Sequence, residues 1–386
     1  MNAPPLALYA HFPWCVQKCP YCDFNSYTLK DQLPEERYVD ALLRDLDAQA
    51  GSVEGRPLTS MFFGGGTPSL FSPGALARLI EHARARLGFL ESVEITLEAN
   101  PGTIERGRFS EYRAAGISRV SLGAQSFDER QLKRLGRIHS ADETRRAADE
   151  LHAAGLKNFN LDLMYALPDQ TPEEAESDVR AALALEPAHV SQYHLTIEPG
   201  TVFAAAPPVQ PADEVVEQML DRSLQMLGAA GFEQYEVSGY ARPGARCLHN
   251  LNYWNFGDYL GIGAGAHGKV SDPLRELVIR TQQPREPRRY LASEPAVRLQ
   301  RAIAPRDLPF EFAMNAFRLV DGFSDALFEA RTGLPIEILE RALRPIEARG
   351  LVARELGCWR ATPQGLRFLN DILVALLPEP GAATGS

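Results

Sequence analysis

Cysteine is scarce in this chain, with five residues among 386, and the few present are unevenly placed. Cys15, Cys19 and Cys22 crowd into one short segment, so the cysteines do not form the even, spread-out set typical of a disulfide framework. Such crowding favours metal ligation in a reducing compartment. Cys247 and Cys358 stand apart, and we expect each to be an ordinary small buried residue.

Long apolar runs and excess positive charge are also missing. No run approaches the roughly 20 apolar residues of a membrane span, and the N-terminus has neither a charged region nor a cleavage site. These absences predict a cytoplasmic protein that does not insert into a membrane. The net charge of -10 excludes a broad cationic surface, so nucleic acid is not expected as a main partner.

The first half of the chain alternates short apolar segments with longer helical patterns. The expected strands cover residues 6–12, 60–63, 93–97, 118–122, 158–164 and 190–196, and the expected helices cover 35–49, 74–87, 141–154 and 172–185. This βα repeat predicts an α/β fold built on a partial or full (β/α) barrel. In such barrels the functional groups lie just past the carboxyl ends of the strands.

Two domains are expected, because single cores stop growing near about 250–300 residues. We assign residues 1–285 to the barrel domain, with residues 236–268 as a motif-rich loop and 272–289 as a linker or surface excursion. The sequence pattern predicts that residues 300–378 form a smaller helical domain with the order of helices and strands typical of a winged helix. Residues 379–386 are expected to form a disordered tail. A winged helix can bind DNA, but the acidic chain favours a lid or docking module.

The cysteine-rich segment has the spacing C-x3-C-x2-C directly after the first predicted strand, with Pro13 and Pro20 fixing its path. Three thiolates on a 4Fe-4S cluster leave one iron open, and the amino and carboxylate groups of S-adenosylmethionine (SAM) fit that position. A reduced cluster can then split the sulfonium to give a deoxyadenosyl radical. Structural zinc is the alternative, but it needs a fourth ligand, which His11 or Asp23 would have to provide.

Further polar and glycine residues follow the later strands. The glycine triplet before Thr67 lets the backbone approach a ligand closely, which suits the methionyl end of SAM. Polar residues near the strand ends are Glu98, Gln125, Arg137 and Asp162. Their carboxylates can bind ribose hydroxyls, and the arginine can pair with a carboxylate. Each of them alone is compatible with an ordinary surface position, but their position in one layer of the barrel supports a binding site. Tyr21 either stacks on adenine or packs against the protein.

A second group of candidate ligand residues extends from Cys247 through His249 to Trp254, and a glycine-rich stretch with His267 follows it. It is dense in aromatic and ligand-type side chains. A haem would use an axial histidine with aromatic walls, which this stretch contains. The alternative is a hydrogen-bonded histidine at a turn, with the aromatic residues in the core.

These motifs together resemble the radical SAM family of the oxygen-independent coproporphyrinogen III oxidase and, within it, the branch of HemW-type haem chaperones. The resemblance implies that Cys15, Cys19 and Cys22 ligate the cluster. It also places His249 in the HNxxYW signature of the chaperone branch. The positions that it implies for SAM contact are Tyr9, Tyr21, Gly65, Gly66, Thr67, Glu98, Gln125, Arg137 and Asp162.

Two departures separate this chain from the oxidases of the family. Phe24 stands where they have a further cysteine, and only five residues precede the first strand. The resemblance therefore implies a haem carrier that binds a 4Fe-4S cluster and SAM, delivers haem to acceptor proteins and depends on an electron donor. Radical decarboxylation of coproporphyrinogen III is the alternative, and modification of RNA or protein is a third. No residue is assigned a catalytic role.

Overall fold

The computed structural model describes residues 3–53, 55–103, 108–292 and 298–377. Within these ranges, twelve strands form one sheet with a parallel centre and antiparallel flanks. The seven parallel strands, in spatial order, are β11 (Asp258–Ile262), β1 (Leu6–Phe12), β4 (Leu58–Gly65), β5 (Phe89–Ala99), β6 (Arg119–Gln125), β7 (Phe159–Tyr165) and β8 (His189–His194).

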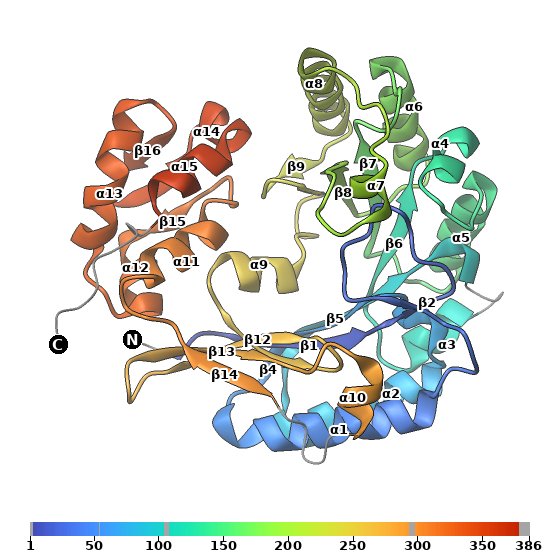
Figure 1. Cartoon of the computed structure of the whole chain (residues 1–386), viewed down its shortest axis with the longest axis horizontal. Helices are drawn as coiled ribbons and strands as arrows, with labels where there is room; N and C mark the ends of the chain where they lie inside the picture. Colours follow the sequence, from blue (N-terminus) through green and yellow to red (C-terminus); the bar gives the residue numbers. More distant parts are fainter. Residues whose placement is uncertain (1–2, 54, 104–107, 293–297, 378–386) are drawn as a thin grey trace.

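Antiparallel strands extend both edges of this parallel centre. Beside β11 lie β12 (His267–Asp272), β13 (Leu277–Gln282) and β14 (Leu299–Ala302), and beside β8 lie β10 (Gly239–Ala241) and β9 (Glu233–Gln234). The two edges do not pair with each other, so the barrel is open, as Figure 1 shows. This confirms the predicted partial (β/α) barrel.

Helices cover the outer face of the curved sheet. Because each crossover between parallel strands contains a helix, the strands are buried on both faces and read as apolar runs; Leu8, Ala10 and Phe12 of β1 are fully buried. Figure 1 shows these helices around the outside of the curve. They are α1 (Glu35–Ala50), α2 (Pro73–Leu87), α3 (Arg108–Ala114), α4 (Glu129–Arg134), α5 (Ala141–Ala153), α6 (Pro172–Leu183) and α8 (Asp213–Ala229).

The predictions for residues 236–268 and 272–289 were wrong. The first range contains α9 (Leu248–Trp254) and the buried parallel strand β11, and the second contains all of β13 and the start of α10 (Pro287–Ala292). Glycines made β11 look like a loop, but they permit close strand contact: a Cβ on Gly261 would lie 2.0 Å from the His267 carbonyl oxygen. Figure 1 shows α9 inside the open curve of the sheet, facing the C-terminal unit.

The C-terminal unit has its own hydrophobic core around Phe312, Leu339 and Trp359. Its three-stranded antiparallel sheet, in the order β15-β17-β16, follows the element order expected of a winged helix. Residues 363–375 form two helices, because the backbone breaks at Phe368. The elements are α11 (Leu308–Ala316), β15 (Phe323–Ser324), α12 (Asp325–Thr332), α13 (Ile336–Ala348), β16 (Val352–Glu355), β17 (Cys358–Ala361), α14 (Pro363–Arg367) and α15 (Leu369–Ala375).

The predicted tail at 379–386 lies outside the described residues. Among the residues that are described, none of the helices combines the length and apolarity that crossing a membrane requires.

Candidate functional site

One cavity of about 530 Å³ lies inside the curve of the sheet, bounded by the loop after β1 and the inner faces of β4 to β8. Its size is within the usual range for small-molecule sites. Twelve of the thirteen predicted site residues line it, and Tyr9 is the exception. The twelve are Cys15, Cys19, Tyr21, Cys22, Gly65, Gly66, Thr67, Glu98, Gln125, Arg137, Asp162 and His249.

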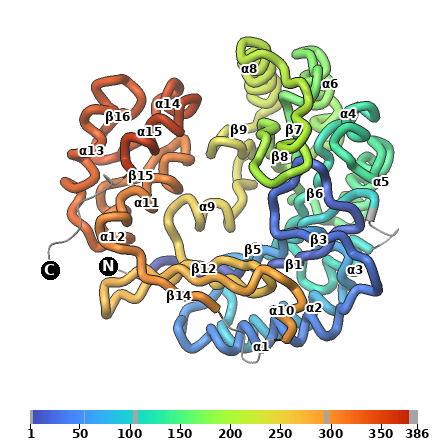
Figure 2. Tube along the Cα trace, in the orientation of Figure 1, coloured from blue at the N-terminus to red at the C-terminus, as the bar shows by residue number. Residues whose placement is uncertain are grey.

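The cysteine loop is held in place by short-range pairing. β2 (Trp14–Cys15) pairs in parallel with β3 (Tyr27–Thr28), which closes the loop at its base. The Lys18 ammonium donates to the carbonyl oxygens of Phe24 and Ser26 at 2.9 and 3.1 Å. On the far side, the Phe203 amide donates to the Pro20 carbonyl over 3.0 Å. Figure 2 shows the loop in blue, and these contacts place the three thiols on one wall of the cavity.

Arg137 connects this loop to the segment after β6. Its guanidinium donates to Cys19 Sγ at 3.6 Å and to the Gly123 carbonyl at 2.9 Å, while its buried Nε has no partner among the described residues. A donor beside a cysteine sulfur is a common way to tune an iron-sulfur centre. Tyr21, next to Cys22, lines the cavity and packs against Phe203, and its stacking on adenine stays a prediction.

The glycine triplet holds the cavity wall close to the cysteine loop. The Gly66 and Thr67 amides donate to the carbonyls of Phe12 and Trp14 at 2.7 and 2.8 Å. A Cβ on Gly66 would lie 2.6 Å from the Trp14 carbonyl oxygen, which is backbone and cannot rotate away. Gly65 has φ +118°, a conformation that favours glycine, and its amide donates to Glu98 Oε2 at 3.0 Å.

Gly66→Ala is therefore expected to lower the free energy of unfolding by about 1–3 kcal/mol, the usual cost of overpacking. Gly74→Ala is the matched control, because nothing lies within 4 Å of a Cβ there, and its effect should stay within about 0.5 kcal/mol. Denaturant unfolding of the two purified variants measures both values. Equal stability of the two variants would contradict the close approach at Gly66.

Two acidic side chains, Glu98 and Asp162, line the cavity. Burial, and the nearby charge of Asp162, raise the pKa of Glu98 to about 8. Burial also raises the pKa of Asp162, although Asn160 and Ser121 donate to its carboxylate at 2.8 and 3.0 Å. Glu98 is thus largely protonated near neutral pH in the ligand-free protein, and a cation bound beside it would favour its ionised form.

The raised pKa of Glu98 predicts a pH-dependent stability. Because its folded-state pKa of about 8 lies above the ordinary 4.5, the folded protein binds more protons between these values. Glu98 therefore destabilises the fold progressively as pH rises from about 5 to 8. Glu98→Gln should be close to the wild type in stability at pH 5 and more stable at pH 9, as measured by unfolding at each pH. The exposed Glu91→Gln serves as control, and a constant difference between Glu98→Gln and the wild type would refute the assignment.

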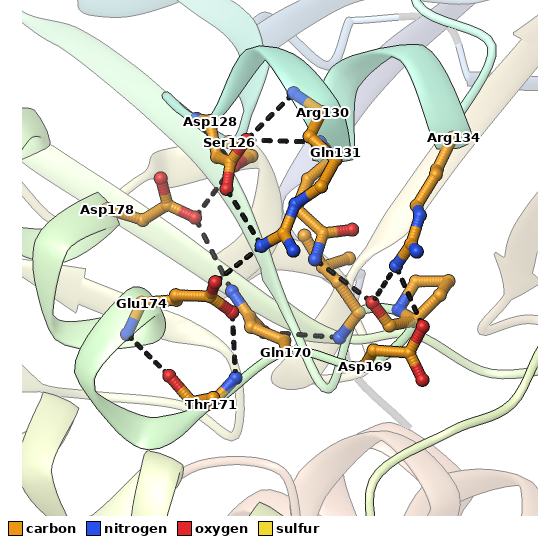
Figure 3. Close-up of polar contacts among 12 residues, drawn as sticks. Ser126, Asp128, Arg130, Gln131, Arg134, Asp169, Gln170, Thr171, Glu174 and Asp178 are labelled. Atoms are coloured by element: carbon orange, nitrogen blue, oxygen red, sulfur yellow. Dashed lines mark hydrogen bonds and ion pairs between the residues drawn. The ribbon is translucent and has the colours of Figure 1, made fainter.

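Gln125 lies at the end of β6 with φ 65°. The next residue, Ser126, begins a polar network that Figure 3 shows. Asp178 of α6 accepts from the Ser126 hydroxyl at 2.8 Å and the Phe127 amide at 2.6 Å. Gln131 of α4 donates to the Pro168 carbonyl at 3.0 Å. The network therefore ties the segment that follows β6 to the loop that follows β7.

Tyr9 lies behind the cavity wall. Its hydroxyl forms a 2.7 Å hydrogen bond with His11 Nδ1, and His11 Nε2 lies 2.9 Å from the Asn25 carbonyl oxygen, so the pair supports the cysteine loop. The sequence-based assignment of Tyr9 to SAM contact therefore stays a prediction.

His249 lies on α9 in a buried cluster with Glu94 and Cys247. Its ring stacks on Phe62 with centroids 4.1 Å apart, and its Nδ1 lies 3.3 Å from Glu94 Oε1 and 3.0 Å from Cys247 Sγ. Burial opposes the charge of Glu94, but hydrogen bonds from His249 and the Leu248 amide and the charge of Arg119 lower its pKa to about 2. Burial lowers the pKa of His249, so the imidazole is neutral.

Cys247 is fully buried, as predicted, but it contacts Glu94 and His249 rather than only apolar groups. The prediction for Cys358 was wrong, because this residue is only partly buried on β17. Its thiol contacts the Asp321 carbonyl oxygen in the C-terminal unit.

Sequence reasoning missed a set of polar side chains inside the strands. A usable signal existed: β6, β7 and β8 are buried on both faces, yet they carry polar residues at alternate positions, which places these residues on one face. A polar residue in such a strand needs a partner, either in the protein or in a ligand. Those that line the cavity are Arg119, Ser121, Asn160 and Ser191.

The open βα barrel with a three-cysteine loop at the carboxyl end of its first strand defines a radical SAM protein. The model of the Radical SAM superfamily matches residues 9–182, and that of the HemN C-terminal domain matches residues 303–368. The chain belongs to the family of the haem chaperone HemW. It is 49% identical to the Escherichia coli protein of that name, over 98% of this chain and all of that one.

Other comparisons agree with this placement. The haem chaperone HemW of Haemophilus influenzae is 46% identical over 97% of this chain and 99% of its own length. Among solved structures, coproporphyrinogen III oxidase (HemN) from Escherichia coli, a radical SAM enzyme, superimposes with a TM-score of 0.81 over 97% of this chain and 90% of its own. At 22% identity, that likeness concerns the fold alone.

Proposed function

We propose that this protein binds a 4Fe-4S cluster, SAM and haem, and that it transfers haem to acceptor proteins. The observation that carries the proposal is one cavity that joins the three-cysteine loop to His249, in a chain that resembles haem chaperones over nearly its whole length. In this account Cys15, Cys19 and Cys22 hold the cluster. When bound, such a cluster supplies an electron and an open iron position for SAM.

The donor set of the cavity fits these cofactors. Cys15, Cys19 and Cys22 are free thiols on one wall, and Arg137 next to them has an unpartnered buried Nε. A Cβ at position 66 would collide with the Trp14 carbonyl oxygen, so the backbone there has no side chain. A ligand chain can therefore lie flat against the Gly66 backbone. Glu98 would become ionised beside the sulfonium, because a neighbouring cation favours the charged carboxylate.

His249 is suited to bind haem iron. Its imidazole is neutral, and Glu94 Oε1 lies 3.3 Å from Nδ1, the arrangement by which a carboxylate orients a metal-ligating histidine. Nε2, which lies 3.4 Å from Cys247 Sγ, would be the nitrogen that meets the iron. Phe62 and Tyr253 contact the ring and give it apolar walls. The cluster and SAM would then govern when haem leaves, by favouring one arrangement of the cavity and the C-terminal unit.

Coproporphyrinogen III oxidation is the competing function, and one experiment separates the two. The reconstituted protein is incubated anaerobically with SAM, a reductant and coproporphyrinogen III, and samples of the same preparation are titrated with haem. We expect stoichiometric haem binding and no protoporphyrinogen. Protoporphyrinogen formation would show an enzyme, and the absence of saturable haem binding would overturn the carrier.

A further inference from the structure

Arg119 is one of the most deeply buried charged side chains, yet it has no hydrogen-bond or ion-pair partner in the part of the chain that the structure describes. Only 2% of it is exposed, and its Nε has no hydrogen-bond partner. Among the described residues, no hydrogen bond or ion pair reaches its guanidinium, yet the side chain lines the cavity. A guanidinium carries five donors and cannot lose its charge, so leaving it unpaired away from water is costly.

The nearby carboxylates already have other partners. Glu94 accepts from the Leu248 and His249 amides at 3.0 and 3.3 Å, and Asp162 accepts from Ser121 and Asn160. Arg119 influences both carboxylates through space without contacting them. Its donors are therefore free for an anionic group that enters the cavity.

We propose that Arg119 binds a carboxylate of a ligand in this cavity, and that this carboxylate is a propionate of haem. A planar guanidinium matches a carboxylate with two parallel hydrogen bonds. The assignment to haem rests on the proposed function. Asn250 and His249 of α9 line the same cavity, so an iron bound at His249 lies in the compartment that Arg119 faces.

The position of Arg119 along β6 separates this subsite from SAM. Arg119 begins the strand and Gln125 ends it, and because a β-bulge between Leu122 and Gln125 shortens the strand by about one step, steps of about 3.3 Å place their backbones roughly 16 Å apart. The cysteine loop contacts the far end of β6, where Arg137 joins Cys19 to Gly123. When SAM is bound, its carboxylate would be held at the open iron of the cluster, toward the opposite end of the strand from Arg119.

The test pairs a change in the protein with a change in the ligand. Wild type, Arg119→Met, Arg119→Lys and the surface control Arg78→Met are reconstituted anaerobically and titrated with haem and with haem dimethyl ester, whose propionates are blocked. We expect Arg119→Met to weaken haem binding by at least about tenfold and to leave ester binding unchanged. Arg119→Lys should recover part of the loss, and Arg78→Met should match the wild type. Unchanged cluster content shows that the variants are folded.

A second arm titrates the same proteins with SAM and with decarboxylated SAM. Loss of discrimination between these two ligands in Arg119→Met would keep the carboxylate subsite but assign it to SAM, even if the wild type failed to bind haem and the proposed function fell. Equal affinity of wild type and Arg119→Met for haem, together with unchanged discrimination in the SAM arm, would overturn the inference. A wild type that binds haem and its ester equally well would overturn the propionate assignment while leaving haem binding intact.

Discussion

Cys22→Ser is expected to abolish the cluster, because a serine hydroxyl is a poor replacement for a thiolate ligand and the other two thiols then leave two irons without protein ligands. After anaerobic reconstitution, iron, acid-labile sulfide and visible absorbance per chain should fall close to zero. The barrel should stay folded, since Cys22 is a partly buried loop residue outside the main hydrophobic core. Circular dichroism and iron analysis of the same sample check both points.

Cys358→Ser is the matched control for this experiment. Cys358 lies on β17 of the C-terminal unit and takes no part in the cavity lining. Its replacement should leave iron and sulfide at wild-type levels. If Cys22→Ser kept the full iron content, the three-cysteine assignment would be wrong, and zinc in the wild type would favour the structural alternative.

His249→Ala is expected to weaken haem binding by more than about tenfold, because the neutral imidazole is the proposed axial ligand and Glu94 orients it. Added imidazole should restore part of the affinity and the ligand-field spectrum by entering the space left by the ring. Haem titration followed by absorbance, with and without imidazole, measures both effects. Cluster content should not change.

His82→Ala on α2 serves as the control for His249→Ala, because this partly exposed ring pairs with Asp47 on the outside of the barrel. It should bind haem like the wild type. A wild-type affinity in His249→Ala would remove His249 as the ligand, and Cys247, 3.0 Å from Nδ1, would be the next residue to replace.

Local sequence predicted the βα frame well. Apolar runs such as residues 6–12 are buried on both faces in the structure, and the three cysteines directly follow the first of them. Gly66 and Asp162 could be placed in one layer because parallel strands end at a common edge. These predictions were possible because they depend on short-range sequence patterns and on the general geometry of parallel sheets.

Other features depended on contacts between distant segments. Strand β11 pairs with β1, which lies some 250 residues away in the sequence. Without knowledge of that partner, the glycines in and around β11 indicate a loop. Arg119 was overlooked because a charge within a strand has meaning only once the surrounding elements are in place. Tyr9 was assigned from a motif, although its hydroxyl contacts His11 behind the cavity wall.

A haem-transfer assay decides whether this protein delivers haem. Reconstituted protein loaded with one equivalent of haem is mixed anaerobically with a haem-free acceptor protein, and the acceptor's spectrum is followed over time with and without SAM. We expect haem to move to the acceptor faster than it dissociates spontaneously, and the rate to change with SAM in the wild type but not in Cys22→Ser. Transfer no faster than spontaneous dissociation would show that the protein is not a haem carrier.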